Sequence, residues 1–266
     1  MLLLRRLGAS VEEQVAGLLH DSSHTAFSHI VDFMMERKDE SYAGDLLLSF
    51  IENGELGKIL EKYGLNSRRI GEYEKHGGFA LLEKPTPELC ADRVDNGLRY
   101  MHYSGIDTKD CVKDLGVRGD RMVFMSKKAA RKFAYGFLKG TASEWGNAEE
   151  GLRAQLIARA IKRGLALHVI TFRLLYQRGE KEILSTLKAS GDKEIMRYLK
   201  LAGGELKFRR VSKGGIFVDE KVRYVNPIFV SGGMEIRLMQ VDKSYRAAVM
   251  KMNKTLKRGY RLKLVE

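Results

Sequence analysis

Apolar residues recur at intervals of three and four over most of the chain, which is the spacing of one face of a helix. Near the beginning, Val11, Val15, Leu18 and Leu19 follow this pattern and predict a buried helix that ends close to His20. Comparable patterns predict further helices over residues 42–52, 55–63, 67–74, 88–103, 127–138, 149–167, 180–189, 192–201 and 244–257. The chain is therefore predicted to be mostly helical.

Strand patterns are fewer and gather toward the C-terminal end. Residues 121–124 give a short strand signal, and beyond Gly179 the segments LKFRRV, KVRYVNPIFV and MEIRLMQV alternate apolar and polar residues. Intervening Gly pairs favour a small antiparallel sheet, and the final GYRLKLVE is predicted to be an edge strand. The fold class predicted is mostly α (α+β), with a helical core over residues 1–178 and an α+β appendage with a basic face over residues 179–266.

The chain is strongly basic: 47 Lys and Arg against 34 Asp and Glu, over 266 residues, give a net charge of +13. Such an excess attracts polyanions, which here means nucleotides, nucleic acid or an anionic membrane surface. A generally basic, solvated surface explains the charge as well. The cations that make the polar side of the appendage basic are Lys207, Arg209, Arg210, Lys213, Lys221 and Arg223. Nucleic acid is therefore one of the partners that the sequence suggests.

Other sequence features indicate the cellular environment of the protein. Arginines inside MLLLRRLGA make this stretch neither a signal peptide nor a membrane span, and no membrane partner is expected. The two cysteines, Cys90 and Cys111, are too few for a disulfide framework, which fits a reducing cytoplasm. The sequence leaves open whether the chain forms a homo-oligomer.

Chemically active side chains are densest in LLHDSSHTAFSHIVD, residues 18–32. Ser22, Ser23 and Thr25 are poor inside helices and good at capping them, so the chain is expected to turn there and begin a second helix. On that helix, residues 29 and 32 lie three apart and share one face. The two helical segments would direct five side chains toward a shared space: His20, Asp21, His24, His29 and Asp32.

Imidazole and carboxylate groups together suit a divalent metal ion, without choosing between zinc, iron, manganese and nickel. A metal in such a site lowers the pKa of bound water and polarises a phosphoryl oxygen. The alternative is structural: His20 and Asp21 would form one satisfied buried pair, followed by capping residues. The density of histidines and aspartates favours the metal site.

The run AGLLHDSSHTAFSH resembles the LLHDxGHxPFSH signature of the HD-domain metal-dependent phosphohydrolases, particularly the branch that includes deoxynucleoside triphosphate triphosphohydrolases. LCADRVDNGLR, which contains Asp92, resembles the distal ADRLDYxxR segment of that branch. VRYVNPIFV resembles a segment of smaller prokaryotic members, so the likeness extends over most of the chain. The resemblance implies an HD-type, all-helical core.

The resemblance also implies a phosphohydrolase that acts on a nucleotide or a related phosphoester and uses a divalent metal ion (Mn, Mg, Fe, Ni or Zn). The roles it implies are metal binding by His20, Asp21 and Asp92, catalysis by His24 and Asp32, and substrate binding by His29 and Arg93.

The sequence departs from the family pattern at several positions. Ser23 stands where the signature has Gly, Asn96 where an aromatic residue is usual, and Ala43 where a DYHE stretch has a His that assists the leaving group. The first metal-ligand His of the family lies in a segment resembling RFxHSxG, upstream of Met1. We therefore expect that the natural chain either extends upstream or has lost this segment. The alternative to an enzyme is an HD fold with a decayed site that serves as a nucleotide- or nucleic-acid-binding module.

Overall fold

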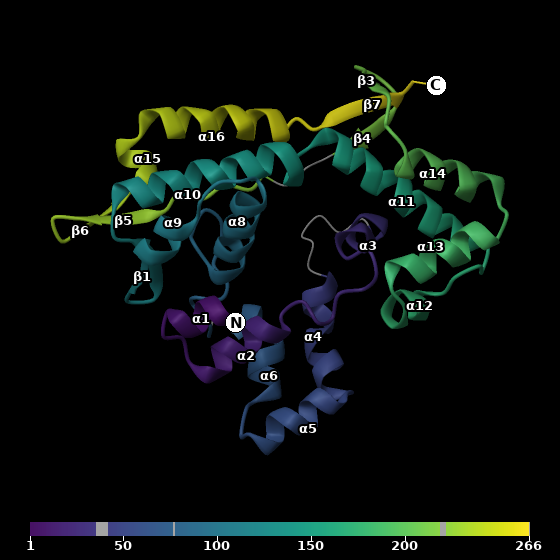
Figure 1. Ribbon diagram of the computed structural model, residues 1–266. Coiled ribbons are helices and arrows are strands. Elements are labelled where there is room, and N and C mark those ends of the chain that lie inside the picture. The colour runs from purple at the N-terminus through teal and green to yellow at the C-terminus, as the bar shows by residue number, and fades with distance from the viewer. Residues whose placement is uncertain (36–41, 77, 219–221, 266) are drawn as a thin grey trace. The chain divides into compact units, whose positions relative to one another are not determined.

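The computed structural model describes residues 1–35, 42–76, 78–218 and 222–265 (Figure 1). The chain forms two compact units, each assembled from separate segments. Unit 1 comprises Met1–Leu19, Ile59–Asn147 and Glu220–Arg258, and unit 2 comprises His20–Lys58, Ala148–Asp219 and Gly259–Glu266. The boundary predicted at residue 179 lies inside unit 2, and the division into a core and an appendage stays a prediction.

Unit 1 combines helices with a four-stranded sheet. Its helices are α1 (Leu2–Arg6), α2 (Val11–Leu19), α6 (Ser67–Gly71), α7 (Tyr73–His76), α8 (Ala91–Tyr103), α9 (Lys109–Asp114), α10 (Lys127–Gly140), the π-helix η1 (Thr141–Trp145), α15 (Leu238–Val241) and α16 (Lys243–Leu256). Its strands are β1 (Leu115–Arg118), β2 (Arg121–Phe124), β5 (Ile228–Ser231) and β6 (Met234–Arg237), in the order β1-β2-β5-β6. Helix α5 (Glu55–Lys62) contains the boundary between the units.

The core of unit 1 lies where α8 packs on α10 and α10 packs on the sheet. Gly97 on α8 lets the helices approach closely, because a side chain there would meet the buried rings of Phe133 and Phe137. On the other side of α10, Tyr135 contacts the buried Tyr245 of α16, with ring centroids 5.1 Å apart. Unit 1 therefore has its own aromatic core.

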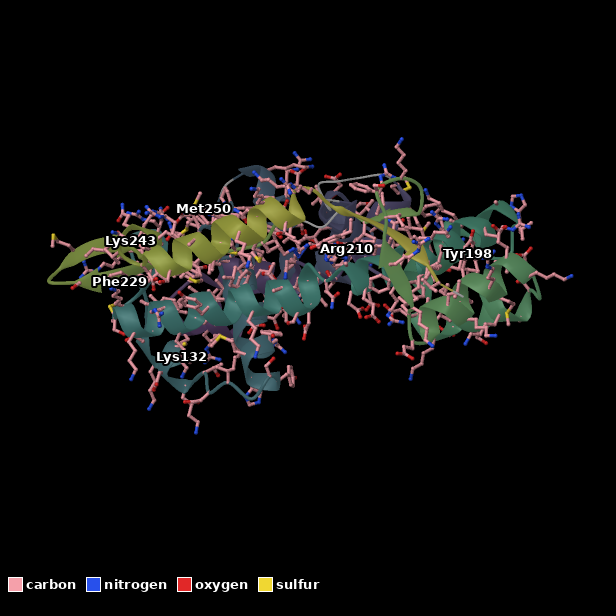
Figure 2. The ribbon with its side chains drawn as sticks, turned by 90° about the horizontal axis from the view of Figure 1, so that it is seen from above. Lys132, Tyr198, Arg210, Phe229, Lys243 and Met250 are labelled. Carbon is pink, nitrogen blue, oxygen red and sulfur yellow. The ribbon has the colours of Figure 1, made fainter. Side chains whose placement is uncertain are left out.

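Unit 2 is built around one long helix. Its elements are α3 (His29–Met34), α4 (Tyr42–Glu52), α11 (Ala148–Ala166), α12 (Phe172–Gln177), α13 (Glu180–Ala189), α14 (Lys193–Gly203) and the strands β3 (Phe208–Arg210), β4 (Ile216–Val218) and β7 (Tyr260–Leu264). Helix α11 packs on α3, α13 and α14 and beneath the small sheet (Figure 1). Tyr198, on α14, is one of the residues packed against these cores (Figure 2).

The fold class is confirmed: the protein is mostly α-helical with small sheets. Among the described helices, none combines the length and apolar character needed to cross a bilayer. Helix α8 begins at Ala91, later than predicted, because Cys90 is extended (φ −142°) and the Ala91 amide donates to the carbonyl of Leu81 instead of continuing a helix. A short strand at Arg121–Phe124 is confirmed, and it pairs in parallel with β5.

The strands after residue 203 divide between two sheets. Strands β5 and β6 join β1 and β2 in unit 1, whereas β3, β4 and β7 form an antiparallel three-stranded sheet in unit 2. The prediction that the last segment is an edge strand is wrong, since β7 lies in the centre, between β3 and β4. Leu262 explains this position: it is fully buried and pairs with both neighbouring strands.

Candidate metal centre

The His-Asp doublet lies directly after the end of α2. The Oγ of Ser10 accepts a hydrogen bond from the Glu13 amide (3.2 Å) in the first turn of this helix. The buried Glu13 carboxylate in turn accepts from the amides of Leu81 and Leu82 (2.7 and 2.9 Å). Helix α2 ends at Leu19, and the turn that follows begins with His20. The predicted place of the doublet, at a helix end, is confirmed.

Asp21 lies between two imidazoles. One carboxylate oxygen is 3.2 Å from His20 Nε2, and the other is 3.3 Å from His24 Nε2. The hydrogen bond with His24 lowers the pKa of Asp21; burial opposes this effect, and the nearby His20 and His29 add to it. Because the Asp21 side chain is 65% exposed, the ionised carboxylate is accessible from solvent. It is an anion with an imidazole nitrogen of His20 and one of His24 beside it.

Ser23 anchors the turn to α4. Its hydroxyl is buried and donates to the carbonyl of Ala43 at 2.8 Å. These are two of the positions at which the chain departs from the family pattern, where Gly and His would be expected. The structure shows that the two departures are in contact, since the Ser23 side chain reaches the backbone of the residue in the His position.

The second half of the motif follows an unusual backbone turn. Phe27 and Ser28 have φ of 64° and 34°, in the left-handed region that non-glycine residues seldom occupy. The turn is held by the Ala26 amide, which donates to the Leu175 carbonyl (2.7 Å), and by the Phe27 amide, which donates to Glu180 (3.3 Å). Strained residues of this kind persist where surrounding contacts over-determine them.

This turn sets the position of His29, the first residue of α3. Its ring meets that of His24 edge to face, with centroids 5.3 Å apart. His20, Asp21, His24 and His29 therefore form one group in unit 2, as predicted from residues 18–32. The backbone of Asp32 belongs to α3, but its side chain lies outside the described part of the structure, and its catalytic role stays a prediction.

Asp92 and Arg93 lie on α8, in unit 1. Asp92 is in the first turn and accepts a hydrogen bond from Asn96 Nδ2 at 2.8 Å. Asn96, which replaces the aromatic residue of the family pattern, thus contacts the candidate ligand directly. The predicted ligands are accordingly divided: His20 and Asp21 belong to unit 2 and Asp92 to unit 1.

Arg93 fixes the segment that precedes α8. Its guanidinium donates to the carbonyls of Glu88 and Lys84 and to the Glu83 carboxylate, each at 2.7 Å. Burial raises the pKa of Glu83, against the opposing effect of Arg93, and burial raises the pKa of the neighbouring Cys90 thiol to about 12. Glu83 could not be recognised from the sequence, because an isolated Glu ten residues before Arg93 belongs to no motif.

The donor chemistry of the group in unit 2 suits a divalent ion, because imidazole nitrogen and carboxylate oxygen lie side by side at His20 and Asp21. Within neither unit do three or more His, Cys, Asp or Glu side chains of the described residues form an arrangement that could hold a metal ion.

Comparisons with known proteins agree with this chemistry. No protein-family model matches the chain. It is 37% identical over 194 residues to the uncharacterized protein YdhJ of Bacillus subtilis, which covers 71% of this chain and 59% of YdhJ. It is 42% identical over 99 residues to the metal-dependent phosphohydrolase cns2 of Cordyceps militaris, which covers 37% of this chain and 28% of cns2. The chain thus spans less than two thirds of either relative.

The fold also has a counterpart of known structure. The crystal structure of a phosphohydrolase from Bacteroides thetaiotaomicron matches with a TM-score of 0.60, covering 94% of this chain and 78% of that one. The two sequences are only 16% identical, so the match shows a shared fold. Together the comparisons support the resemblance to metal-dependent phosphohydrolases, without distinguishing the branch that acts on deoxynucleoside triphosphates.

Proposed function

We propose that the protein is an HD-type metal-dependent phosphohydrolase acting on a nucleotide or a related phosphoester. The observation that carries the proposal is the ionised Asp21 carboxylate, held between His20 and His24 inside a segment that resembles the HD signature. The similarity to a metal-dependent phosphohydrolase supports the same class. The proposal concerns the segment that this chain shares with its relatives, and it does not depend on what the rest of those longer proteins does.

His20, Asp21 and Asp92 are the proposed metal ligands. When bound, a divalent ion (Mn, Mg, Fe, Ni or Zn) supplies Lewis acidity toward a phosphoryl oxygen and lowers the pKa of water. Asp21 suits this role because its carboxylate stays ionised and solvent-accessible. The imidazoles of His20 and His24 lie beside the Asp21 carboxylate.

His24 and Asp32 are the proposed proton-transfer residues. The contact with Asp21 orients His24, whose ring also packs on His29. General acid–base assistance from a positioned side chain contributes about 10²–10⁴-fold to rate. His29, exposed at the start of α3, is proposed to hold a substrate phosphate oxygen.

Arg93 is proposed to bind the substrate phosphate, and its contacts add a positioning function. The guanidinium ties the segment around Glu83 and Glu88 to α8, which carries Asp92. Replacement by Lys keeps the positive charge but loses the forked geometry. Arg93→Lys should therefore raise KM if phosphate binding dominates, and lower metal affinity if positioning of Asp92 dominates.

The test is metal content together with phosphate release from a panel of nucleotides by the purified protein. We expect a divalent ion to bind and support turnover, and Asp21→Ala to lose both. Asp110→Ala is the matched control, because it removes one exposed carboxylate of α9 without touching the motif. Equal metal uptake by the unmodified protein and by Asp21→Ala would contradict the proposal.

A second candidate is a nucleotide-binding module without turnover. The observation that favours it concerns Ala43, which has no imidazole and occupies the position of the family's leaving-group His. Its backbone carbonyl accepts a hydrogen bond from Ser23. This candidate predicts saturable nucleotide binding with no phosphate release at any metal concentration. A cytoplasmic location stays a prediction from the sequence, which leaves open whether the chain forms a homo-oligomer.

A further inference from the structure

The three-stranded sheet of unit 2 has one buried and one exposed face. Val218 and Leu262 point into the core formed with α11 and α14 and are almost completely buried. Side chains alternate between the faces of a strand, so their sequence neighbours point the other way. Arg261, Lys263 and Phe217 all belong to this opposite face and are exposed.

The strand register completes this face with Arg209. Arg209 on β3 pairs directly with Lys263 on the central strand β7, and Phe217 on β4 pairs with Arg261 of the same strand. All four side chains are exposed. We call Arg209, Phe217, Arg261 and Lys263 the outer sheet face.

The outer sheet face places like charges directly opposite each other. A cross-strand pair of cations is destabilising, and nothing in local strand preference calls for one at Arg209 and Lys263. Among the ion pairs between described residues, none involves Arg209, Arg261 or Lys263. Binding an anion would relieve this repulsion.

Phe217 adds an aromatic surface to the same face. Its side chain is 45% exposed. The Arg261 guanidinium lies over the ring, 5.3 Å from its centroid. The planar guanidinium and the ring together offer a platform on which another flat group can stack.

The outer sheet face differs from the basic face expected from sequence. Arg210 lies on the opposite side of β3, where its guanidinium is 4.4 Å from the centroid of the Tyr260 ring (Figure 2). Arg223 belongs to unit 1, and Lys221 lies outside the described residues. Arg209 contributes to the outer sheet face and Arg210 does not, because a step of one residue along a strand reverses the side-chain direction.

We propose that the outer sheet face binds single-stranded nucleic acid. Three cations would contact successive phosphates, and Phe217 with Arg261 would stack an unpaired base, the combination that single-strand binding proteins use. Arg261 and Lys263, two residues apart on β7, are separated by about 7 Å along the strand. This is comparable with the distance between phosphates of an extended single strand.

The composition of this face argues against other anionic partners. A duplex keeps its bases stacked inside and would leave the Phe217 ring without a stacking partner. An anionic membrane would be expected to engage several apolar side chains, and Phe217 is the one large apolar side chain of the four. The proposal does not depend on metal binding or on phosphate release.

Binding would be measured by fluorescence anisotropy with a labelled single-stranded oligonucleotide and the same sequence as a duplex, at several salt concentrations. We expect the full chain to bind the single strand more tightly than the duplex. Arg209→Gln with Lys263→Gln should weaken binding and make the slope of log K against log salt shallower by about 0.7 for each lost phosphate contact. Phe217→Ala should weaken binding roughly 5- to 150-fold with the slope unchanged.

The matched control removes the same charge elsewhere. Lys251 and Lys254 are exposed on α16 of unit 1, a helix whose outward side also carries Lys243 and Met250 (Figure 2). Lys251→Gln with Lys254→Gln should leave binding unchanged. Phe217→Tyr keeps an aromatic ring and should bind as the unmodified chain does. Comparing it with Phe217→Ala separates loss of stacking from loss of folding.

Five results would overturn the proposal. The first is no binding of the single strand by the unmodified chain at low salt. The second is equal weakening by the α16 control, which would mean a general effect of net charge. The third is duplex binding as tight as single-strand binding, and the fourth is unchanged binding by Phe217→Ala. Loss of phosphatidylserine vesicle binding in the sheet variants, with oligonucleotide binding intact, would assign the face to membranes and overturn it as well.

Discussion

At the scale of single residues, some carboxylates of this protein have structural roles and others are accessible to a ligand. Glu13 is buried and satisfies two backbone amides, whereas Asp21 is exposed and lies between two imidazoles. Asp242 caps α16, accepting from the Tyr245 amide at 2.9 Å and from Arg131 at 2.8 Å. The same side-chain chemistry is structural where the carboxylate is buried and accepts from backbone amides or a guanidinium, and available to a ligand where solvent reaches it.

Asp242 provides a test of the capping role. Its burial raises the pKa, but the hydrogen bonds from Tyr245 and Arg131 outweigh this and leave the pKa lowered. A lowered pKa means that the ionised carboxylate stabilises the fold above its unfolded pKa, and that this stability is lost as the pH falls through the folded value. We expect Asp242→Ala to reduce the free energy of unfolding by about 0.5–2 kcal/mol at neutral pH.

Denaturant unfolding at several pH values measures this effect. The difference between the unmodified protein and Asp242→Ala should be constant at neutral pH and shrink in acid, below the ordinary pKa of an aspartate near 3.9. A difference that grows as the pH falls would contradict the assignment.

At the scale of elements, close helix contacts depend on glycine. A Cβ at Gly97 would lie 2.9 Å from the Phe137 ring and 3.0 Å from that of Phe133. These rings form the interface of α8 with α10, so α8 has little freedom to shift. The same helix carries Asp92, and its packing therefore determines where that candidate ligand lies within unit 1.

Gly97→Val should separate α8 from α10 and reduce the free energy of unfolding by about 1–3 kcal/mol, the usual cost of overpacking. Gly203→Ala is the matched control, since nothing lies within 4 Å of a Cβ at that position on α14. The control should be neutral or slightly stabilising, because Ala favours a helix by about 1 kcal/mol over Gly. Thermal unfolding of both variants would decide, and equal stability of Gly97→Val and the unmodified chain would refute the packing argument.

At the scale of the whole molecule, the proposed metal ligands belong to different units. His20 and Asp21 lie in unit 2, and Asp92 lies in unit 1. Binding to the native state alone stabilises it by RT ln(1 + [L]/Kd), about 2.7 kcal/mol at a hundredfold excess over Kd. Binding of a divalent ion by the proposed ligands should therefore raise the unfolding temperature of the protein.

Thermal unfolding with and without Mn²⁺ tests whether Asp21 and Asp92 both bind the metal ion. We expect the metal-induced rise in Tm to be lost in Asp21→Ala and in Asp92→Ala, and retained in Asp110→Ala. A full rise in Asp92→Ala would mean that the ligands of unit 2 suffice, and would remove Asp92 from the site.

The sequence by itself determined the features that depend on neighbours along the chain. The spacing of Val11, Val15, Leu18 and Leu19 predicted helix α2 but not its buried side, since Val11 and Leu18 are exposed. A short strand signal predicted β2 at Arg121–Phe124. The His20–Asp21 doublet and its capping residues predicted a turn at the end of a helix. Periodicity and capping are local properties, so they can be read from the sequence without a partner.

Only the tertiary structure decided which segments meet. The pairing of β2 with β5, the central place of β7 and the contact of Ser23 with Ala43 all join residues that lie far apart in the sequence. The outer sheet face has the same origin, because Arg209 and Lys263 become neighbours only through the register of β3 with β7. Register is determined by which side chains can be buried together, and the burial of Leu262 against both neighbouring strands determines it here.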